Sequence, residues 1–320
     1  MPSYLGIDIG GTNLKVAVVS EKGVVQAFRS EPWSGGSPET AVAHLTQLAN
    51  TIFSECHPEQ LSACGAGCAG LVDQAAGVVR SSPNLPAWRD VELMARLERA
   101  FDLPTVIDND ANAAGYAECV IGAARGARHA VVLTLGTGIG GGIIVDGRIY
   151  HGASGFAGEV GHMVIARDGS PCACGGSGCL ETLASAGSLV ARATDLVKAG
   201  AASELAAAVE SGTLESLDVG EAARRGDPVA LKAVHAVGLA LGTGLANIVQ
   251  ILDPEIIVLG GGVAAAGEPL MAAARVALSA QVAGRRGRLP KLEFARAGEA
   301  AGVIGASLIA RDEFAGPAGS

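Results

Sequence analysis

Gly158-Glu-Val-Gly-His162 and, after a short spacer, Cys172-Ala-Cys-Gly-Gly-Ser-Gly-Cys-Leu-Glu181 form the stretch around which the rest of the chain is organised. The stretch supplies one imidazole and three thiolates, a soft ligand set that suits tetrahedral zinc. The glycines between the cysteines allow the chain to turn tightly enough for all three sulfurs to reach one ion. We therefore expect a structural zinc site with the ligands His162, Cys172, Cys174 and Cys179.

Two carboxylates flank these ligands. Glu159 precedes His162 by three residues, which is the spacing of one helical turn, and Glu181 follows the last cysteine almost directly. Four protein ligands close a structural zinc site, so the metal needs neither carboxylate. Solvated surface positions are the ordinary alternative for both side chains. Their position beside the zinc loop instead predicts that Glu159 and Glu181 build part of a substrate pocket.

Length and composition favour a layered α/β protein. The chain has 320 residues, which exceeds the usual size of a single domain and predicts one large or two medium domains. Hydrophobic residues make up 49% and aromatic residues only 3%, so small aliphatic side chains must form the helix–sheet contacts. The net charge is −9, and the short basic patch at 285–288 is interpreted as a solvated loop. A negative charge without a large basic surface argues against nucleic acid and anionic membranes as partners.

The cysteines and the N-terminus predict a cytoplasmic protein. Seven cysteines are an odd number for a secreted disulfide framework, and Asp8 and Lys15 interrupt the segment that would have to be the apolar core of a signal peptide. The most apolar stretch, residues 130–145, is too short to span a bilayer comfortably. A reducing compartment is therefore expected, and residues 315–320 are expected to be a disordered tail.

The first glycine turn has the features of a phosphate site. Strands are predicted over 4–9, 14–20 and 24–30, and the first turn reads Asp-Ile-Gly-Gly-Thr-Asn from Asp8. Its two glycines allow backbone N–H groups to face an anion, and an acid at this position suits a hydrated Mg²⁺. A Gly-Gly turn alone is common between strands, but the acid before it and the hydroxyl after it favour a phosphate role. The candidate residues are Asp8, Gly10, Gly11, Thr12 and Asn13.

Two later stretches also have a strand that runs into a glycine-rich turn. Strands predicted over 130–135 and 143–146 enclose Gly136-Thr-Gly-Ile-Gly-Gly-Gly, and a strand over 255–259 runs into Gly260-Gly-Gly. A pair of hairpins of this kind could hold a polyphosphate, and the third turn offers close backbone approach to a nucleobase or ribose. Neither hairpin has the spacing of a nucleotide P-loop or of the dinucleotide fingerprint. The candidate residues are Thr137, Gly138, Gly140 and Gly261.

Polar side chains also gather at the end of the strand that begins at Thr105. Ligands of α/β sheets collect outside the carboxyl ends of strands, where Asp108, Asn109 and Asp110 are crowded. Capping of the helix predicted over 111–121 is the alternative. We assign Asn109 and Asp110 to substrate and Asp108 to a cap or turn. Asn84 lies in a proline-bounded turn, where a structural asparagine is the ordinary interpretation.

Together these motifs resemble the ROK family (repressors, open reading frames and sugar kinases) of the actin-like ATPase superfamily. The resemblance extends over essentially the whole chain, and its most specific element is the spaced histidine with the three-cysteine motif. Ser82-Pro-Asn-Leu-Pro-Ala-Trp is similar to the bacterial glucokinase members in particular. One departure is Gly67-Cys-Ala-Gly-Leu-Val, where family members often carry a proline at the third position.

The resemblance implies an α/β, two-lobed actin-like ATPase (ribonuclease H-like) fold with a cleft between the lobes. The expected lobes are 1–112, joined by a C-terminal helix over 302–312, and 113–301, which carries the zinc loop 158–181. Homodimers are common in the family, so a homodimer is expected.

The resemblance also implies a hexokinase-type phosphotransferase that phosphorylates a hexose, foremost glucose, at its 6-hydroxyl, as in glycolysis. MgATP would lie on the glycine hairpins, and Asp110 would act as general base. The remaining sugar ligands would be Asn84, Asn109, Glu159, His162 and Glu181, and zinc would lie on His162 and the three cysteines.

Several alternatives stay open. The sugar could be fructose, mannose, N-acetylglucosamine or N-acetylmannosamine, and the donor could be polyphosphate. A sugar-responsive repressor is a remote alternative, because such a protein needs a DNA-binding module and the strand predicted from Tyr4 leaves no room for one before it. A sugar-binding protein without catalysis would not need Asp110 or the hairpins.

Overall fold

The structure is a computed structural model that describes residues 2–58, 60–282, 284 and 289–314. The basic patch at 285–288 and the tail at 315–320 lie outside the described residues. The chain forms two compact units: the first contains 2–132, 142–158 and 295–314, and the second contains 133–141 and 159–294. The predicted lobes 1–112 and 113–301 remain a prediction, and these units divide the chain differently, since 113–132 and 142–158 group with the first unit.

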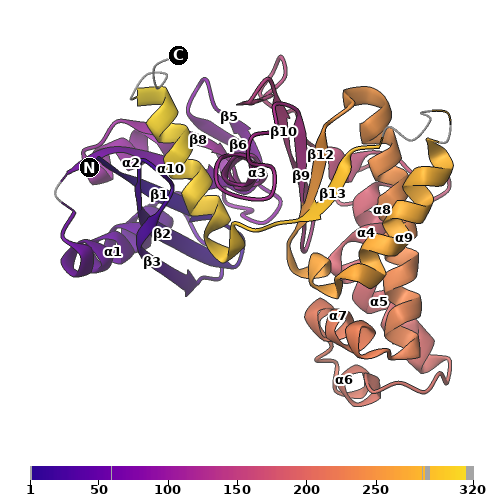
Figure 1. The fold of residues 1–320 in the computed structure, drawn as a ribbon. Helices are drawn as coiled ribbons and strands as arrows, with labels where there is room; N and C mark the ends of the chain where they lie inside the picture. Colours follow the sequence, from indigo (N-terminus) through magenta and orange to yellow (C-terminus); the bar gives the residue numbers. More distant parts are fainter. Residues whose placement is uncertain (1, 59, 283, 285–288, 315–320) are drawn as a thin grey trace. The chain divides into compact units, whose positions relative to one another are not determined.

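The first unit is built on a five-stranded sheet of order β3-β2-β1-β4-β8 (Figure 1). β1 pairs with β2 antiparallel and with β4 parallel, and β4 pairs with β8 parallel. The strands are β1 (Ser3–Ile9), β2 (Asn13–Ser20), β3 (Val25–Pro32), β4 (Leu61–Cys68) and β8 (Thr105–Asn109).

Helices cover both faces of this sheet because its strands alternate in the direction of their side chains. Leu5, Ile7 and Ile9 pack with the buried residues of α1 (Pro38–Cys56) and α2 (Leu93–Phe101), whereas Tyr4 packs with Ala310 of α10 (Ala301–Phe314). Helix α3 (Asp110–Val120) packs against α10 on this second face.

The C-terminal helix α10 lies so close to the sheet and to α3 that only glycine fits at the contacts. A Cβ at Gly65 would lie 1.8 Å from the carbonyl oxygen of Ala306, and one at Gly305 would lie 1.7 Å from that of Ala113. Both neighbours are backbone atoms, so a side chain at either position would force the helix away from its support.

We expect Gly305→Ala to destabilise the protein although alanine favours helices. Overpacking of a tight contact typically costs about 1–3 kcal/mol, which outweighs the gain of up to about 1 kcal/mol in helix propensity. Urea denaturation measures the difference. Gly187→Ala in α5 (Ala186–Lys198) is the matched control, because the nearest atom to its added Cβ would be 3.9 Å away. Equal stability of the two variants would show that the contact at Gly305 relaxes without cost.

A small sheet in the first unit was not anticipated from the sequence. It has the order β5-β6-β7 and consists of β5 (Leu71–Asp73), β6 (Val78–Ser81) and β7 (Arg89–Val91). Strands of three or four residues are too short to show a periodic pattern. The sequence pattern predicts a helix over 91–101, but Val91 belongs to β7 and the helix α2 begins at Leu93.

A second five-stranded sheet has the order β11-β10-β9-β12-β13. Its strands are β9 (Ala130–Leu135), β10 (Ile139–Val145), β11 (Arg148–Ile149), β12 (Ile256–Gly260) and β13 (Lys291–Phe294). Because β10 begins at Ile139, four residues earlier than expected, the second glycine turn is short and Gly140 lies within a strand.

Apart from its strands, the second unit consists mainly of helices. The sequence pattern predicts one helix over 182–198, but the structure has two, α4 (Leu180–Ala184) and α5. The break occurs because Ser185 adopts an extended conformation and its hydroxyl accepts a hydrogen bond from the N–H of Ser188. The other helices are α6 (Ala206–Ser211), α7 (Ser216–Arg225), α8 (Pro228–Leu252) and α9 (Glu268–Gln281).

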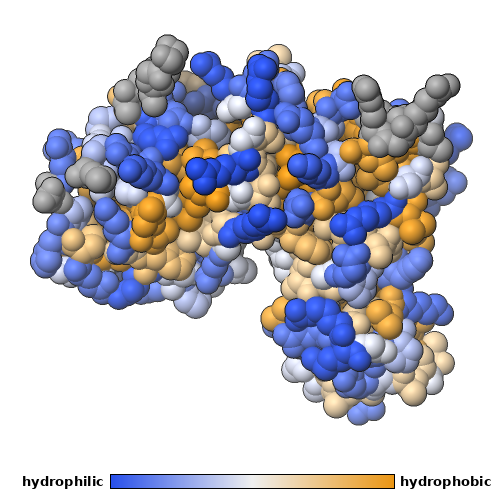
Figure 2. Space-filling view, in the orientation of Figure 1, coloured by the Kyte–Doolittle hydropathy of each residue, from blue (hydrophilic) through white to orange (hydrophobic). Residues whose placement is uncertain are grey.

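Helix α8 is the central helix of this unit. Among the described residues it is the one helix whose length and composition would suit a membrane span, and 61% of its most apolar window is buried in the protein. It packs closely on α9, since a Cβ at Gly242 would lie 2.3 Å from the carbonyl oxygen of Ala274. Figure 2 shows that some hydrophobic surface remains around α9, where Val276 is 63% exposed. The burial of α8 is that of a core helix.

Candidate active site

In the first unit, three parallel strands end at one edge of the sheet. The register aligns Asp8 of β1 with Gly67 of β4, and Gly67 with Asp108 of β8. Since neighbouring strands lie about 4.8 Å apart, Asp8 and Asp108 are separated by about 10 Å. This edge therefore gathers the Asp8 turn and the sequence Asp108-Asn-Asp110 at the carboxyl ends of the strands, where ligands of such sheets bind.

Trp33 shapes the turn between β1 and β2. Its backbone N–H donates to the carbonyl oxygen of Thr12 at 2.9 Å, and its indole Nε1–H donates to that of Gly10 at 3.0 Å. The amide of Asn13 donates to the hydroxyl of Thr12 at 3.1 Å. The N–H of Gly10 donates to the carbonyl oxygen of Asn13 at 3.1 Å. These bonds engage carbonyl groups of the turn, so its other backbone N–H groups are the polar atoms suited to an anion. Sequence reasoning did not assign Trp33 this role.

Asn84 lies against the same turn. A Cβ at Gly11 would be 2.8 Å from the Cβ of Asn84, so the approach requires glycine at position 11. The asparagine is exposed, which leaves its amide accessible. The predicted sugar ligand Asn84 and the predicted phosphate turn are thus neighbours in the first unit.

Asn109 is the N-cap of α3, which begins at Asp110 rather than Ala111. Its side-chain oxygen accepts the N–H groups of Ala111 at 2.9 Å and Asn112 at 3.2 Å, and its Nδ2 donates to the carbonyl oxygen of Gly70 at 3.0 Å. One N–H of Asn109 is left for a ligand. Because Asn109 already serves as the cap, the carboxyl of Asp110 is not needed for capping.

The loop that lacks the family proline is held from two sides. The N–H of Ala69 donates to the carbonyl oxygen of Ile9 at 3.1 Å, and the carbonyl of Gly70 receives the Asn109 amide. Gly70 has a φ of +121°, a conformation that strongly favours glycine. These contacts fix the loop beside the strand ends without a proline.

In the second unit, Glu181 connects the zinc loop with the second glycine turn. Its Oε2 accepts the N–H of Ile139 at 2.9 Å, and a Cβ at Gly138 would lie 2.6 Å from the same oxygen. Glu159 is linked to this region through His162, whose Nε2 lies 3.7 Å from Oε2 of Glu159 and whose Nδ1 lies 3.6 Å from the sulfur of Cys172. Desolvation raises the pKa of Glu159, His162 opposes the shift, and the Glu181 carboxylate adds to it. Thr137, Gly138, Glu159 and Glu181 therefore belong to one region of this unit.

Gly261 has a structural reason for being glycine. Its φ is +87°, and a Cβ there would lie 2.5 Å from the carbonyl oxygen of Leu135 at the end of β9. The turn after β12 thus packs directly on the residues that precede the second glycine turn.

The distances among the predicted metal ligands fit zinc. The four ligand atoms lie within 4.8 Å of one another, with 3.7 Å between the sulfurs of Cys174 and Cys179 and 3.6 Å from the sulfur of Cys172 to Nδ1 of His162. Tetrahedral zinc separates two sulfurs by about 3.8 Å and a sulfur from a nitrogen by about 3.6 Å. Nε2 of His162 lies 3.7 Å from Oε2 of Glu159, which places a carboxylate on the other ring nitrogen.

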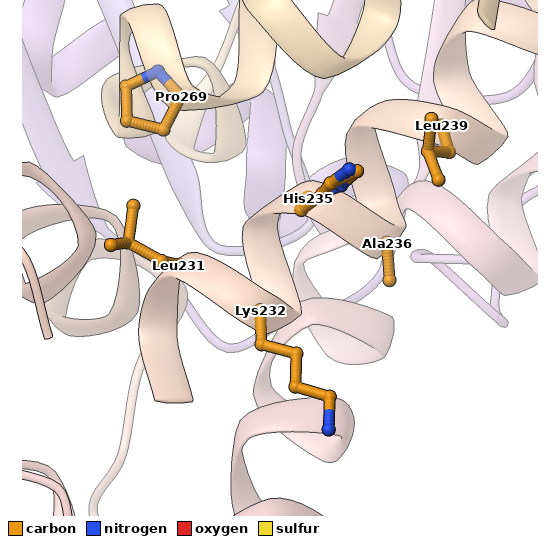
Figure 3. Close-up of a pocket in the computed structure, with 6 residues that line it drawn as sticks. All are labelled: Leu231, Lys232, His235, Ala236, Leu239 and Pro269. Atoms are coloured by element: carbon orange, nitrogen blue, oxygen red, sulfur yellow. The ribbon is translucent and has the colours of Figure 1, made fainter. Parts of the chain in front are cut away.

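A cavity elsewhere in the second unit contains none of these residues. It has a volume of about 600 Å³ and lies between α8 and the start of α9 (Figure 3). The residues that line it are Leu231, Lys232, His235, Ala236, Leu239 and Pro269. Its lining is mainly aliphatic, so the predicted chemistry does not lie there.

The fold and these groups define the class of two-lobed α/β proteins that share the sugar-kinase fold. Residues 4–313 match the ROK family, and the chain belongs to that family. The predicted family and fold class are confirmed.

Three relatives illustrate the similarity. A glucokinase of Halalkalibacterium halodurans is 36% identical over 97% of this chain and 95% of its own length. The crystal structure of a ROK family glucokinase from Streptomyces griseus in complex with glucose and AMPPNP superposes with a TM-score of 0.84, at 33% identity over 97% of this chain and 99% of that one. A xylose repressor of Caldicellulosiruptor bescii is 31% identical over 81% of this chain and 65% of its own length.

Proposed function

We propose that this protein is a hexokinase-type kinase that transfers the terminal phosphoryl group of ATP to the 6-hydroxyl of glucose. The observation that carries the proposal is the sheet edge of the first unit, where the Asp8 turn, Asn84 and Asp110 are gathered. The similarity to glucokinases over nearly the full length of both chains supports the same reaction. Phosphoryl transfer depends mainly on positioning and charge neutralisation, which such an edge is suited to provide.

The donor would be MgATP. In the turn of Gly10, Gly11, Thr12 and Asn13, the N–H of Gly10 donates to the carbonyl oxygen of Asn13 at 3.1 Å, and the other backbone N–H groups would bind phosphate. Thr137 and Gly138 of the second turn and Gly140 at the start of β10 would bind the same nucleotide, together with Gly261. Desolvation raises the pKa of Asp8, whereas Lys15, with its Nζ 3.5 Å from the Asp8 carboxylate, opposes the shift. Mg²⁺ near Asp8 would favour the ionised carboxylate and would neutralise charge on the phosphate oxygens.

Asp110 would be the general base for the sugar hydroxyl. Its Oδ1 accepts the N–H of Ala111 at 2.9 Å, which orients the carboxyl group at the start of α3. A carboxylate held next to the sugar hydroxyl can accept its proton as the phosphoryl group is transferred.

The other hydroxyl groups of the sugar would be held by the polar side chains of Asn84, Asn109, Glu159, His162 and Glu181. Once a bound sugar covers these groups they give selectivity, because a sugar that lacks one hydroxyl leaves its partner unpaired. Asn109 would contribute its remaining N–H, since its oxygen is occupied by capping.

Zinc would have a structural role, because four protein ligands leave no open position. A homodimer, a cytoplasmic location and a place in glycolysis complete the proposal. They rest on the family resemblance and, for the location, on the free cysteines among the described residues.

We expect glucose to give the highest kcat/KM in an ADP-release assay with ATP across a panel of hexoses. Fructose and mannose should be poorer, and N-acetylglucosamine and N-acetylmannosamine should be poorer by about tenfold or more, since their 2-substituent must pass Glu159 and His162. A higher kcat/KM for an acetylated sugar would overturn the choice of glucose and leave the kinase assignment intact. Sugar binding without any turnover would instead favour a sugar-responsive repressor. The similarity to a xylose repressor, weaker than that to the glucokinases, is the observation behind this alternative.

A further inference from the structure

Asp108 is a buried carboxylate with both oxygens engaged. It is only 3% exposed. Oδ1 accepts the backbone N–H of Asn109 at 2.7 Å and the side-chain Nδ2 of Asn112 at 2.9 Å, and Oδ2 lies 2.7 Å from Nε2 of His151. Since carboxylate oxygens serve as acceptors, we assign Nε2–H of His151 as the donor to Oδ2 of Asp108. The bond to Asp108 accordingly raises the pKa of His151, against the effect of desolvation.

His151 also closes a glycine-rich loop with its own backbone. Its carbonyl oxygen accepts the N–H of Ala157 at 3.0 Å. Gly152 and Gly155, with φ values of +73° and +86°, allow the chain to return within so few residues. The loop leads to Gly158 and directly into Glu159. The imidazole of His151 thus ties this loop to the end of β8 and the start of α3.

The orientation of the Asn112 side chain depends on the Asp108 carboxylate. It is 2% exposed, and its side-chain oxygen is buried without a hydrogen-bond partner in the described part of the chain. The bond from its Nδ2 to Asp108 is therefore the contact that orients the side chain. If the Asp108 carboxylate turned, both Asn112 and the backbone of Asn109 would lose their partner.

The imidazole is not wholly enclosed. Its side chain is 27% exposed, and it borders a cavity of about 630 Å³ that Leu71, Arg80 and Phe156 also line. Among the described residues its second nitrogen, Nδ1, has no protein partner. A histidine with one nitrogen committed to a buried carboxylate and the other toward solvent holds that carboxylate in a fixed orientation.

We propose that His151 is a positioning residue for phosphoryl transfer. Its Nε2–H fixes the Asp108 carboxylate, and Asp108 fixes the backbone at Asn109, from which Asp110 projects. This inference rests on the proposed function, since the position it fixes is that of the proposed general base. A shift of about 1 Å at a catalytic group can cost about 100-fold in rate, so the imidazole affects turnover without touching the substrate.

The test compares His151→Ala with His151→Gln, because glutamine retains an N–H donor near the position of Nε2. We expect His151→Ala to lower kcat by about 100-fold with little change in the KM for ATP, and His151→Gln to recover at least about tenfold of that loss. Once His151 is replaced by alanine, adding Asp108→Asn should have a smaller effect than it has alone, since the two side chains act as one unit. His235→Ala is the matched control, because His235 is an exposed residue that lines the α8 cavity, and its kcat should equal that of the wild type.

Thermal unfolding and circular dichroism separate positioning from folding. A kcat for His151→Ala within about threefold of wild type, or a loss fully explained by the unfolded fraction, would overturn the inference. Glutamine as inactive as alanine would also overturn it. A wild-type protein inactive with every hexose would overturn the proposed function itself, whereas an active wild type with an active His151→Ala variant would overturn only the role of His151.

Discussion

Asp110→Asn is expected to reduce kcat by about 10²–10⁴-fold, the usual cost of losing a general base. Asparagine has the same shape and can still accept the N–H of Ala111, but it cannot take a proton from the sugar hydroxyl. The KM for ATP should change little, and glucose binding should weaken only modestly through the altered hydrogen bond.

The structure makes this substitution a clean test. The N-cap of α3 is Asn109, so the change at Asp110 does not remove the capping interaction. Circular dichroism and thermal unfolding should therefore match the wild type. Asp195→Asn, an exposed aspartate on α5, is the matched control and should retain full turnover. Near-normal turnover of Asp110→Asn would falsify the assignment, and Asp108 would then be the next residue to examine.

Loss of zinc is expected to remove both stability and activity. Purified protein should contain about one zinc per chain, because the four ligands close one site. Glu181 lies two residues beyond Cys179 and holds the N–H of Ile139, while His162 lies three residues beyond Glu159. Without the metal, both proposed sugar carboxylates lose the loop that supports them.

Cys179→Ser tests this directly, since Cys179 is 1% exposed and its sulfur lies 3.7 Å from that of Cys174. The loss of activity should exceed the roughly 10–100-fold that removal of an outer-shell partner typically costs. Cys56→Ser, at the end of α1, should keep the zinc and the activity. Metal analysis that finds no zinc in fully active protein with all thiols reactive would contradict the zinc site.

Features formed by residues close together in the chain could be predicted from the sequence alone. The predicted zinc ligands from His162 to Cys179 lie within 18 consecutive residues, and their ligand atoms lie within 4.8 Å of one another because tight glycine turns bring the cysteines together. The same holds for the turn after Asp8 and for the polar strand end at Asp108, because a strand followed by a glycine turn or a helix start leaves a local pattern.

Short or interrupted elements were less predictable. β5, β6 and β7 have too few residues for a periodic signal, and the break at Ser185 is hidden within a continuous helical pattern. The role of Asn109 as the N-cap was open as well, since Asp, Asn and Ser are similarly good caps.

Only the tertiary structure decided which distant groups meet. His151 and Asp108 are 43 residues apart, and Glu181 and Ile139 are 42 apart. The carboxylate of Glu118 accepts the backbone N–H of Arg296, 178 residues away, which anchors the chain just before α10. Local propensity and periodicity carry no information about such pairs, because they depend on strand order, sheet register and the packing of helices on the sheet. The sequence therefore determined the chemical groups of the site, and the fold determined which of them act on one another.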